Sequence, residues 1–284
     1  MAFLRALTIM TLFIAVTLLC IPVQVLAMKF RLPWRKTFPG VYHRTVCRLI
    51  GIRIRKIGTP VAGGALIAAN HSGWIDIPVL AALTPVSFVA KSEIDAWPFF
   101  GMLARLQETI FVRRGERARA LEDRDHIRRR LSNGDTLVIF PEGTSSDGNR
   151  VLRFKSTLLS AAELPLGEDG HHAPVQPVSI ALTRFHGLPM GRENRPFFAW
   201  YGDMELVPHL WQGFHLGPIE VVVEFHPVLS IDQAGGRKQL AAAAEMAVRS
   251  GVIRALSGAS TVAAPAADMQ DDAAGNEETE EEAA

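Results

Sequence analysis

The uncharged stretch Ala6–Met28 restricts the fold of this chain more than any other feature. It runs for 23 residues without a charged side chain and is mostly apolar. As an α-helix it would be about 34 Å long, enough to cross the hydrocarbon core of a bilayer. A cleaved signal peptide is the alternative, supported by the small-residue pattern at Val25–Ala27. The run is long for a signal peptide and only Arg5 precedes it, so we expect a membrane anchor.

Cations are concentrated after this run. Arg5 alone precedes it, whereas Lys29, Arg31, Arg35, Lys36, Arg44, Arg48 and Arg53 follow it, interleaved with Trp34, Phe38 and Tyr42. The positive-inside tendency and the interfacial preference of aromatic rings predict that residues 1–50 form an anchor and a basic interfacial segment. We expect an inner-membrane protein, single-pass or monotopic, whose catalytic domain faces the cytoplasm and contacts the membrane surface.

The charge of the chain is divided unevenly. From Ala259 onward there are eight acidic residues and no Lys or Arg, so residues 1–258 hold 30 basic and 21 acidic residues, a net charge of +9. A basic body suits an anionic partner. The tail, 259–284, has the composition of a disordered acidic segment. The two cysteines, Cys20 and Cys47, suggest no disulfide framework, and no Cys/His cluster has the spacing of a zinc site.

Strand and helix patterns alternate through the rest of the chain. This alternation predicts an α/β fold, with a mostly parallel sheet flanked by helices, over residues 51–258. The expected strands are 65–69, 86–90, 109–112, 136–140, 175–182 and 219–225, and the expected helices are 77–83, 99–107, 116–131 and 237–256.

The heptapeptide NHSGWID, residues 70–76, places a histidine and an aspartate between two apolar segments. His71 and Asp76 would not share a helix face, so they can meet only if His71 lies in the turn before a helix and Asp76 in its first turn. A carboxylate bonded to one ring nitrogen would leave the other as a general base. For this motif alone an ordinary turn is the stronger interpretation. Ser72 lacks the surroundings of a nucleophile elbow.

Two further strand ends carry groups that suit a polar substrate. Arg113, Arg114 and Gly115 follow one strand, and guanidinium groups bind phosphate oxygens well. Glu142, Gly143 and Thr144 follow another, in a turn that offers amides, a hydroxyl and a carboxylate. In α/β sheets ligands bind at the carboxyl ends of strands, so the three segments could form one site.

These segments, taken in order, resemble the sequence blocks of the glycerolipid acyltransferase family over roughly residues 50–230. NHSGWID is similar to its H-x4-D block, FVRRG to its second, FPEGTSS to its third and VQPV to its fourth. The resemblance implies that His71 is a general base oriented by Asp76. It also implies that Arg113, Arg114, Gly115, Glu142, Gly143, Thr144 and Lys155 bind the acceptor. No metal or cofactor is implied, and the donor is acyl-CoA or acyl carrier protein.

The resemblance leaves two acceptors open. The main interpretation is acyl transfer to the free hydroxyl of 1-acylglycerol-3-phosphate, which gives phosphatidic acid. The alternative is lyso-ornithine lipid or another lysolipid, because FPEGTSSDGNRVLRFKS is similar to a branch that acylates lyso-ornithine lipid. An inactive membrane-tethered scaffold and a nucleic-acid binder are less favoured, since His71 and Asp76 are intact and no recognition motif is present. His209 and Trp211 could touch the membrane or the acyl chain, but we favour their interpretation as parts of a packed surface turn.

Overall fold

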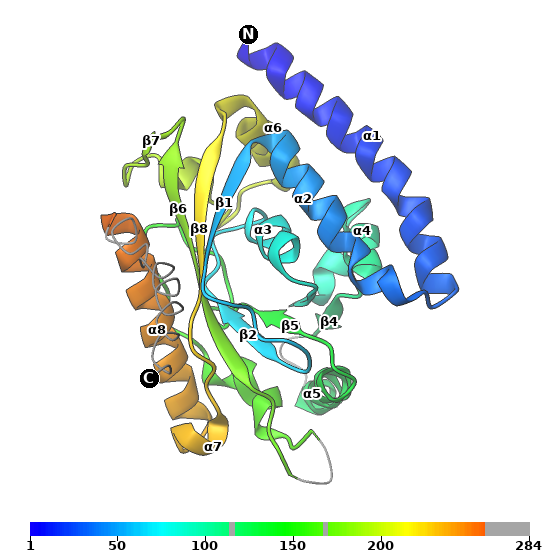
Figure 1. Ribbon diagram of the computed structural model, residues 1–284, viewed down its shortest axis with the longest axis vertical. Helices are drawn as coiled ribbons and strands as arrows, with labels where there is room; N and C mark the ends of the chain where they lie inside the picture. The colour runs from blue at the N-terminus through cyan, green and yellow to red at the C-terminus, as the bar shows by residue number, and fades with distance from the viewer. Residues whose placement is uncertain (114–116, 167–169, 259–284) are drawn as a thin grey trace, which may run out of the picture.

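The computed structural model describes residues 1–113, 117–166 and 170–258. Within them, eight strands form one sheet, in the order β1-β8-β6-β2-β5-β3-β4, with β7 paired to β6 (Figure 1). The strands are β1 Ile52–Ile57, β2 Leu66–Ala69, β3 Ser87–Lys91, β4 Ile110–Val112, β5 Leu137–Ile139, β6 Val175–Phe185, β7 Leu188–Pro189 and β8 Ile219–Phe225.

The prediction of a mostly parallel sheet is confirmed. β2 is parallel to both β5 and β6, and β3 is parallel to both β5 and β4. β8 runs antiparallel to β6, and β1 is parallel to β8 at the sheet edge. The carboxyl ends of β2, β5, β3 and β4 therefore lie along one edge of the sheet, where the loops that follow them gather.

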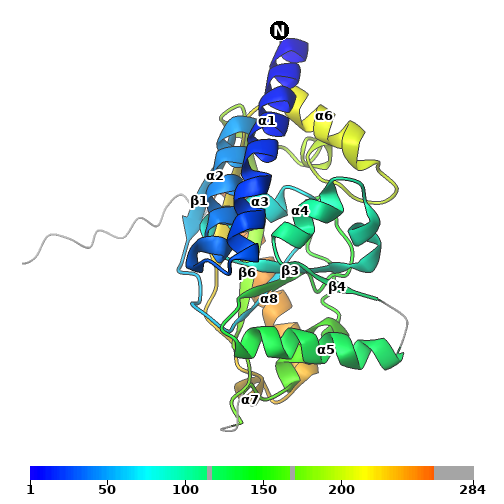
Figure 2. The same ribbon diagram turned by 90° about the vertical axis from the view of Figure 1, so that its right-hand side faces the viewer.

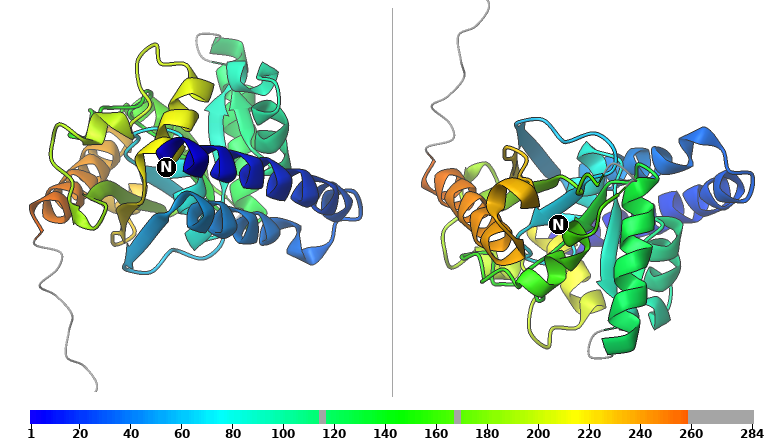
Figure 3. Two further views of the ribbon diagram at one scale, coloured as in Figure 1. Left: turned by 90° about the horizontal axis from the view of Figure 1, so that it is seen from above. Right: turned by 90° about the horizontal axis from the view of Figure 1, so that it is seen from below.

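Helices cover both faces of the sheet. α1, α2, α3, α4 and α6 lie on one side and α8 on the other (Figures 1 and 3), and α5 lies below α4 in Figure 2. The helices are α1 Ala2–Lys29, α2 Phe38–Ile50, α3 Asp76–Leu83, α4 Phe100–Leu106, α5 Arg117–Ser132, α6 Leu206–Leu216, α7 Ile231–Ala234 and α8 Arg237–Ser257, with 3-10 turns at Pro33–Lys36, Ser92–Ala96, Ser156–Glu163 and Arg195–Phe197.

The central strand β2 shows why both faces are covered. All four of its residues are buried. Ile67 and Ala69 belong to the core beneath α2, α3 and α6, whereas Leu66 and Ala68 belong to the core beneath α5 and α8. Successive side chains of a strand point to opposite faces, so a strand that is apolar at every position needs a helix layer on each side.

Helix α1 is long and apolar enough to cross a membrane. It does not stand apart from the domain, because it packs against α2 and α6 (Figure 2). Its buried residues, Ala6, Ile9, Thr17, Gln24 and Ala27, follow helical spacing and form one inward stripe. Its other faces expose large apolar side chains such as Leu4, Leu18, Leu19 and Leu26.

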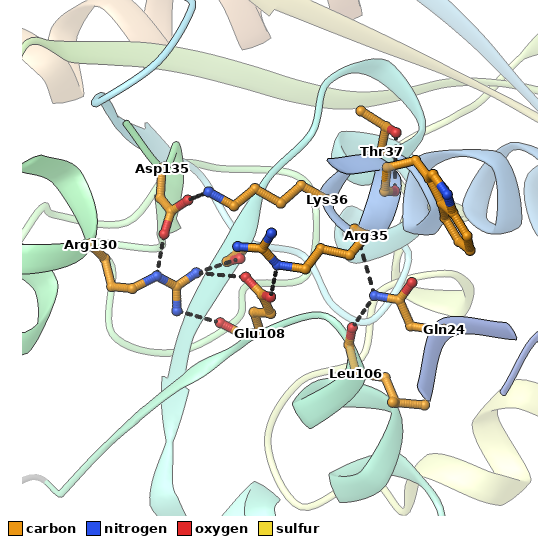
Figure 4. A network of polar contacts seen from close by, with 10 residues as sticks. Gln24, Arg35, Lys36, Thr37, Leu106, Glu108, Arg130 and Asp135 are labelled. Atoms are coloured by element: carbon orange, nitrogen blue, oxygen red, sulfur yellow. Dashed lines mark hydrogen bonds and ion pairs between the residues drawn. The ribbon is translucent and has the colours of Figure 1, made fainter. Parts of the chain in front are cut away.

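Two cations of the basic segment after α1 point into the protein. Arg35 Nε lies 3.2 Å from Glu108 Oε1, and Lys36 binds Asp135, which also binds Arg130 (Figure 4). Arg35 and Lys36 are therefore tied to the body of the protein by ion pairs, while the assignment of this segment to the membrane interface stays a prediction.

Every strand and helix expected from the sequence is present, with boundaries that shift by a few residues. The strands β1 and β7 and the helices α2, α6 and α7 were not expected. His209 and Trp211 lie on α6, so their interpretation as parts of a surface turn is wrong. The acidic tail, 259–284, lies outside the described residues.

Candidate active site

His71 and Asp76 meet in the way that the sequence allows. β2 ends at Ala69, α3 begins at Asp76, and the loop between them presents the histidine. Asp76 Oδ2 accepts a hydrogen bond from His71 Nδ1 at 2.7 Å. Because the carboxylate accepts, the neutral imidazole carries its proton on Nδ1 and keeps the lone pair on Nε2. The predicted contact is confirmed, and the ring has the arrangement of a general base.

The carboxylate of Asp76 also holds the loop. It is fully buried, and Oδ2 accepts further hydrogen bonds from the backbone amides of Ser72 at 2.7 Å and Gly73 at 3.0 Å. Ser72 Oγ donates to Oδ1 at 3.0 Å. Ser72 is therefore a buried structural partner of Asp76. Gly73 has a φ of 152°, and a Cβ there would lie 2.7 Å from the amide nitrogen of Trp200, so only glycine fits.

The loop after β5 joins the loop after β2. The ring of Phe140 stacks on the imidazole of His71 with centroids 4.0 Å apart and an angle of 17° between the planes. The backbone amide of Ser146 donates to the carbonyl of His71 at 2.8 Å. Two of the three segments thus converge, as the strand order requires. Phe140 thus covers one face of the His71 ring, a contact that the sequence did not predict.

Glu142 is buried beneath this junction. Neither of its carboxylate oxygens forms a hydrogen bond of normal geometry among the described residues. Burial raises the pKa of Glu142 from 4.5 to about 8, and the charge of Asp76 adds to the rise, while the amides of His71 and Leu152 act in the opposite direction. Near neutral pH this group is therefore mostly a neutral acid that can donate a hydrogen bond.

Gly143, Thr144 and Lys155 lie at the surface end of the same loop. Gly143 is buried and Thr144 is exposed. The backbone amide of Lys155 donates to the carbonyl of Pro141 at 2.8 Å. Its side chain extends over Gly143, because a Cβ at Gly143 would lie 2.9 Å from Nζ. The ammonium group is thus held beside the loop that carries Glu142.

Arg113 lies farther from His71 than the residues of the Glu142 loop do. It is exposed at the end of β4, and its backbone amide donates to Asp123 Oδ2 at 3.2 Å. In the sheet order, β5 and β3 lie between β2 and β4. Because three strand intervals separate β4 from β2, the two backbones are about 14 Å apart. At this separation Arg113 shares an edge of the sheet with His71 but does not touch it. Arg114 and Gly115 lie outside the described residues.

An apolar cavity of 280 Å³ opens beside the pair. His71 and Trp74 line it together with residues of α1, α2, α4 and α6, among them Phe13, Ile21, Leu103 and Phe214. Helix α1 therefore forms one wall of the cavity. A cavity of this character suits an alkyl chain.

The arrangement can deprotonate a hydroxyl next to an apolar chain. His71 Nε2 is positioned to take a proton, and Asp76 to stabilise the resulting imidazolium. Among the described residues no group of three or more His, Cys, Asp or Glu side chains could hold a metal ion.

This chain matches a protein-family model, the sequences of several known proteins and a solved structure. A family model described as Acyltransferase matches residues 52–181. A lyso-ornithine lipid O-acyltransferase of Brucella abortus is 45% identical over 247 residues, which cover 86% of this chain and 92% of that protein. A protein of the same description from Rhizobium meliloti is 42% identical and covers 81% of this chain and 79% of its own length.

More distant matches carry another description. A 1-acyl-sn-glycerol-3-phosphate acyltransferase of Neisseria gonorrhoeae is 29% identical and covers 70% of this chain and 74% of its own. The crystal structure of the 1-acyl-sn-glycerophosphate acyltransferase PlsC from Thermotoga maritima has a TM-score of 0.62 at 23% identity, and the match covers 89% of this chain and 97% of that one. At this identity the likeness extends to the fold.

Proposed function

This chain belongs to the acyltransferase family, and from that premise we propose that it transfers a fatty acyl group to the free hydroxyl of lyso-ornithine lipid. Two acceptors were left open by the sequence, and 1-acylglycerol-3-phosphate was preferred. Relatives at 45% and 42% identity that are described as lyso-ornithine lipid O-acyltransferases favour the alternative over relatives at 29%. The enzyme is an O-acyltransferase that acts on a lysolipid and moves groups other than aminoacyl groups.

The observation that carries the mechanism is the His71–Asp76 pair at the wall of the apolar cavity. His71 Nε2 takes the proton of the acceptor hydroxyl as its oxygen attacks the thioester carbonyl of the donor. Asp76 stabilises the imidazolium that forms. The new ester bond forms and the carbon–sulfur bond breaks, and the leaving thiolate takes the proton from His71. This sequence of steps requires no metal ion.

The remaining site residues serve the head group of the acceptor. Lys155 and Arg113 supply positive charge to the carboxylate of an amino-acid head group, and Thr144 supplies a hydroxyl. Glu142 and Gly143 shape the loop on which the head group rests. Arg114 and Gly115 belong to the same binding segment. The acyl donor is acyl-CoA or acyl carrier protein.

The surface of α1 supports a location of the enzyme at a membrane. Its outward faces are apolar, while its inward stripe contacts the catalytic domain. We therefore place α1 and the adjoining face of the domain against the inner membrane, with the active site on the cytoplasmic side. Because α1 packs along the domain and does not stand free of it, we favour a monotopic arrangement over a single-pass one.

An assay with two acceptors tests this function. Purified full-length protein in mixed micelles is supplied with one labelled acyl donor and with either lyso-ornithine lipid or 1-acylglycerol-3-phosphate, in separate reactions. The same pair of reactions is run once with acyl-CoA as the donor and once with acyl carrier protein as the donor. We expect kcat/KM for lyso-ornithine lipid to be at least about tenfold higher than kcat/KM for 1-acylglycerol-3-phosphate. His71→Ala should lower kcat/KM for lyso-ornithine lipid by about 10²–10⁴-fold. Faster formation of phosphatidic acid would reverse the choice of acceptor, and full activity of His71→Ala would contradict the mechanism.

A further inference from the structure

A hydrogen bond connects the catalytic loop to a histidine on a distant part of the chain. Trp74 lies between His71 and Asp76, and its Nε1 donates to His209 Nδ1 on α6 at 3.0 Å. We infer that His209 is a positioning residue, which fixes Trp74 and thereby the loop that presents His71 and Asp76. This inference rests on the proposed function, because it assigns His209 to the same reaction.

The chemistry of the bond determines the form of His209. An indole N–H can only donate, so Nδ1 has to accept and the ring proton lies on Nε2. His209 is 5% exposed. Burial lowers the pKa of His209, and the backbone of Ala199 acts in the opposite direction. The neutral ring that the bond requires is thus the form that burial favours. With Nδ1 occupied and Nε2 buried, His209 is no second general base.

Helix α6 encloses the indole on other sides as well. The rings of Trp74 and Phe214 meet at 90° with centroids 6.3 Å apart. A Cβ at Gly213 would lie 3.3 Å from Trp74 Cζ2, so the indole packs directly on the helix. These apolar contacts cover much of the indole, which is half-buried, but provide no acceptor for its N–H. An unsatisfied N–H in such a place is unfavourable, so His209 favours this orientation of Trp74 over others.

A second bond holds the same loop. The backbone amide of Trp200 donates to the carbonyl of Ser72 at 2.8 Å. The segment from Trp200 to His209 therefore holds the loop at Ser72 through the backbone and at Trp74 through a side chain. The backbone bond persists in any variant, whereas the side-chain bond depends on a histidine. Substitution of His209 can thus displace the loop without removing its other support.

Kinetics of matched variants test the inference. His209→Phe keeps the ring shape but removes the acceptor, His209→Asn restores an acceptor near the position of Nδ1, and Trp74→Phe removes the donor. His215→Phe is the control, because His215 is exposed on the same helix. We expect His209→Phe and Trp74→Phe each to lower kcat about tenfold or more, with KM for the acyl donor changed by less than about threefold. His209→Asn should recover most of the lost kcat.

A double-mutant cycle distinguishes this role from a general loss of stability. In the Trp74→Phe background, His209→Phe should lower kcat no further, because the bond is already absent. Additive losses, unchanged kcat in Trp74→Phe, or equal kcat in His209→Phe and His215→Phe would each overturn the inference. If His209→Phe does not fold, Trp74→Phe and His209→Asn decide the question. Full activity of His71→Ala would instead contradict the proposed mechanism, and absence of acyl transfer to lyso-ornithine lipid by the wild-type protein would contradict the proposed function, so these failures are distinguishable from failure of the inference.

Discussion

Asp76 has two functions in one buried carboxylate. It orients the imidazole of His71, and it accepts three hydrogen bonds from Ser72 and Gly73 that shape the loop. An amide at this position would turn an N–H group toward donors on at least one side. The geometry of the pair and that of the loop are therefore not independent.

Asp76→Asn should consequently lower both activity and stability. We expect kcat/KM to fall by about 10²–10⁴-fold, since the base loses its orienting charge, and Tm to fall as well. Ser72→Ala is the graded comparison, because it removes one bond to Oδ1 and leaves the bond to His71. It should keep activity within a few-fold of wild type; a loss as large as that of Asp76→Asn would mean that Ser72 takes part in the reaction.

Glu142 predicts a pH dependence of stability. Its pKa is higher in the folded protein than the ordinary 4.5, so the folded state binds more protons between pH 4.5 and about 8. Its contribution to stability is full below pH 4.5 and is lost as the pH rises through about 8. Glu142→Gln mimics the neutral acid. Thermal unfolding between pH 5 and 9 should show that Tm of Glu142→Gln, relative to wild type, rises with pH; a constant difference would contradict the buried-acid description.

At the scale of single residues the sequence predicts local pairs and misses distant partners. The His71–Asp76 contact was predictable because both residues belong to one short loop. The block FPEGTSS, which Phe140 begins, indicates that this residue lies near the site. Nothing in the sequence indicates that its ring stacks on His71. His209 lies 135 residues from Trp74, and their bond exists only through tertiary packing.

At the scale of elements, strongly patterned segments were predictable and mixed ones were not. β8 is found at Ile219–Phe225, as expected, because its apolar alternation is clear. β1 alternates isoleucine with basic residues, a signal that could have found it. α6 contains Pro208 and Gly213, which resemble turn residues, and its helical form depends on packing against α1 and the core. Local propensity was overridden there by tertiary contacts.

The packing of α8 on the sheet depends on a missing side chain. Gly251 faces a buried cluster in which Ser179 Oγ and His226 Nε2 are 2.5 Å apart. A Cβ at Gly251 would overlap Ser179 Oγ and lie 2.7 Å from His226 Nε2. Alanine is the better helix former by about 1 kcal/mol, but here its methyl group has no space.

Gly251→Ala should therefore destabilise the fold by a net of about 1–3 kcal/mol, because overpacking exceeds the gain in helix propensity. The measurement is urea unfolding in detergent. Ser250→Ala, on the exposed face one residue earlier, should be neutral or slightly stabilising. Equal stability of the two variants would show that α8 can shift away from the sheet without loss.

At the scale of the whole molecule, a charge network joins the segment that follows α1 to the sheet and to α5. Asp135 binds Lys36 from the segment after α1 and Arg130 from α5 (Figure 4). Burial alone would raise the pKa of Asp135, but Lys36 and Arg130 together hold it below its usual range. The pairing therefore stabilises the protein above pH 4 and is lost as the pH falls through the depressed pKa.

Asp135→Asn leaves Lys36 and Arg130 without this partner. The pairs are intermediate in burial, so we expect a loss of about 2–3 kcal/mol at pH 7, between the values for exposed and buried pairs. The difference from wild type in urea unfolding should shrink as the pH falls below about 4. Asp95→Asn, in the exposed pair with Arg105, should change stability by less than about 1 kcal/mol. A pH-independent difference for Asp135→Asn would argue against the charge pairing.

The inward stripe of α1 has a consequence for how far this helix can be exchanged. Phe13, Thr17, Ile21 and Gln24 are part of the cavity wall beside His71, and Gln24 Nε2 donates to the carbonyl of Leu106 at 2.9 Å. A generic hydrophobic helix of equal length would satisfy the bilayer but not the cavity. The anchor of this enzyme is therefore not a modular tether. One face of the helix is free to be any apolar surface, whereas the other has to fit the cavity that His71 and Trp74 also line.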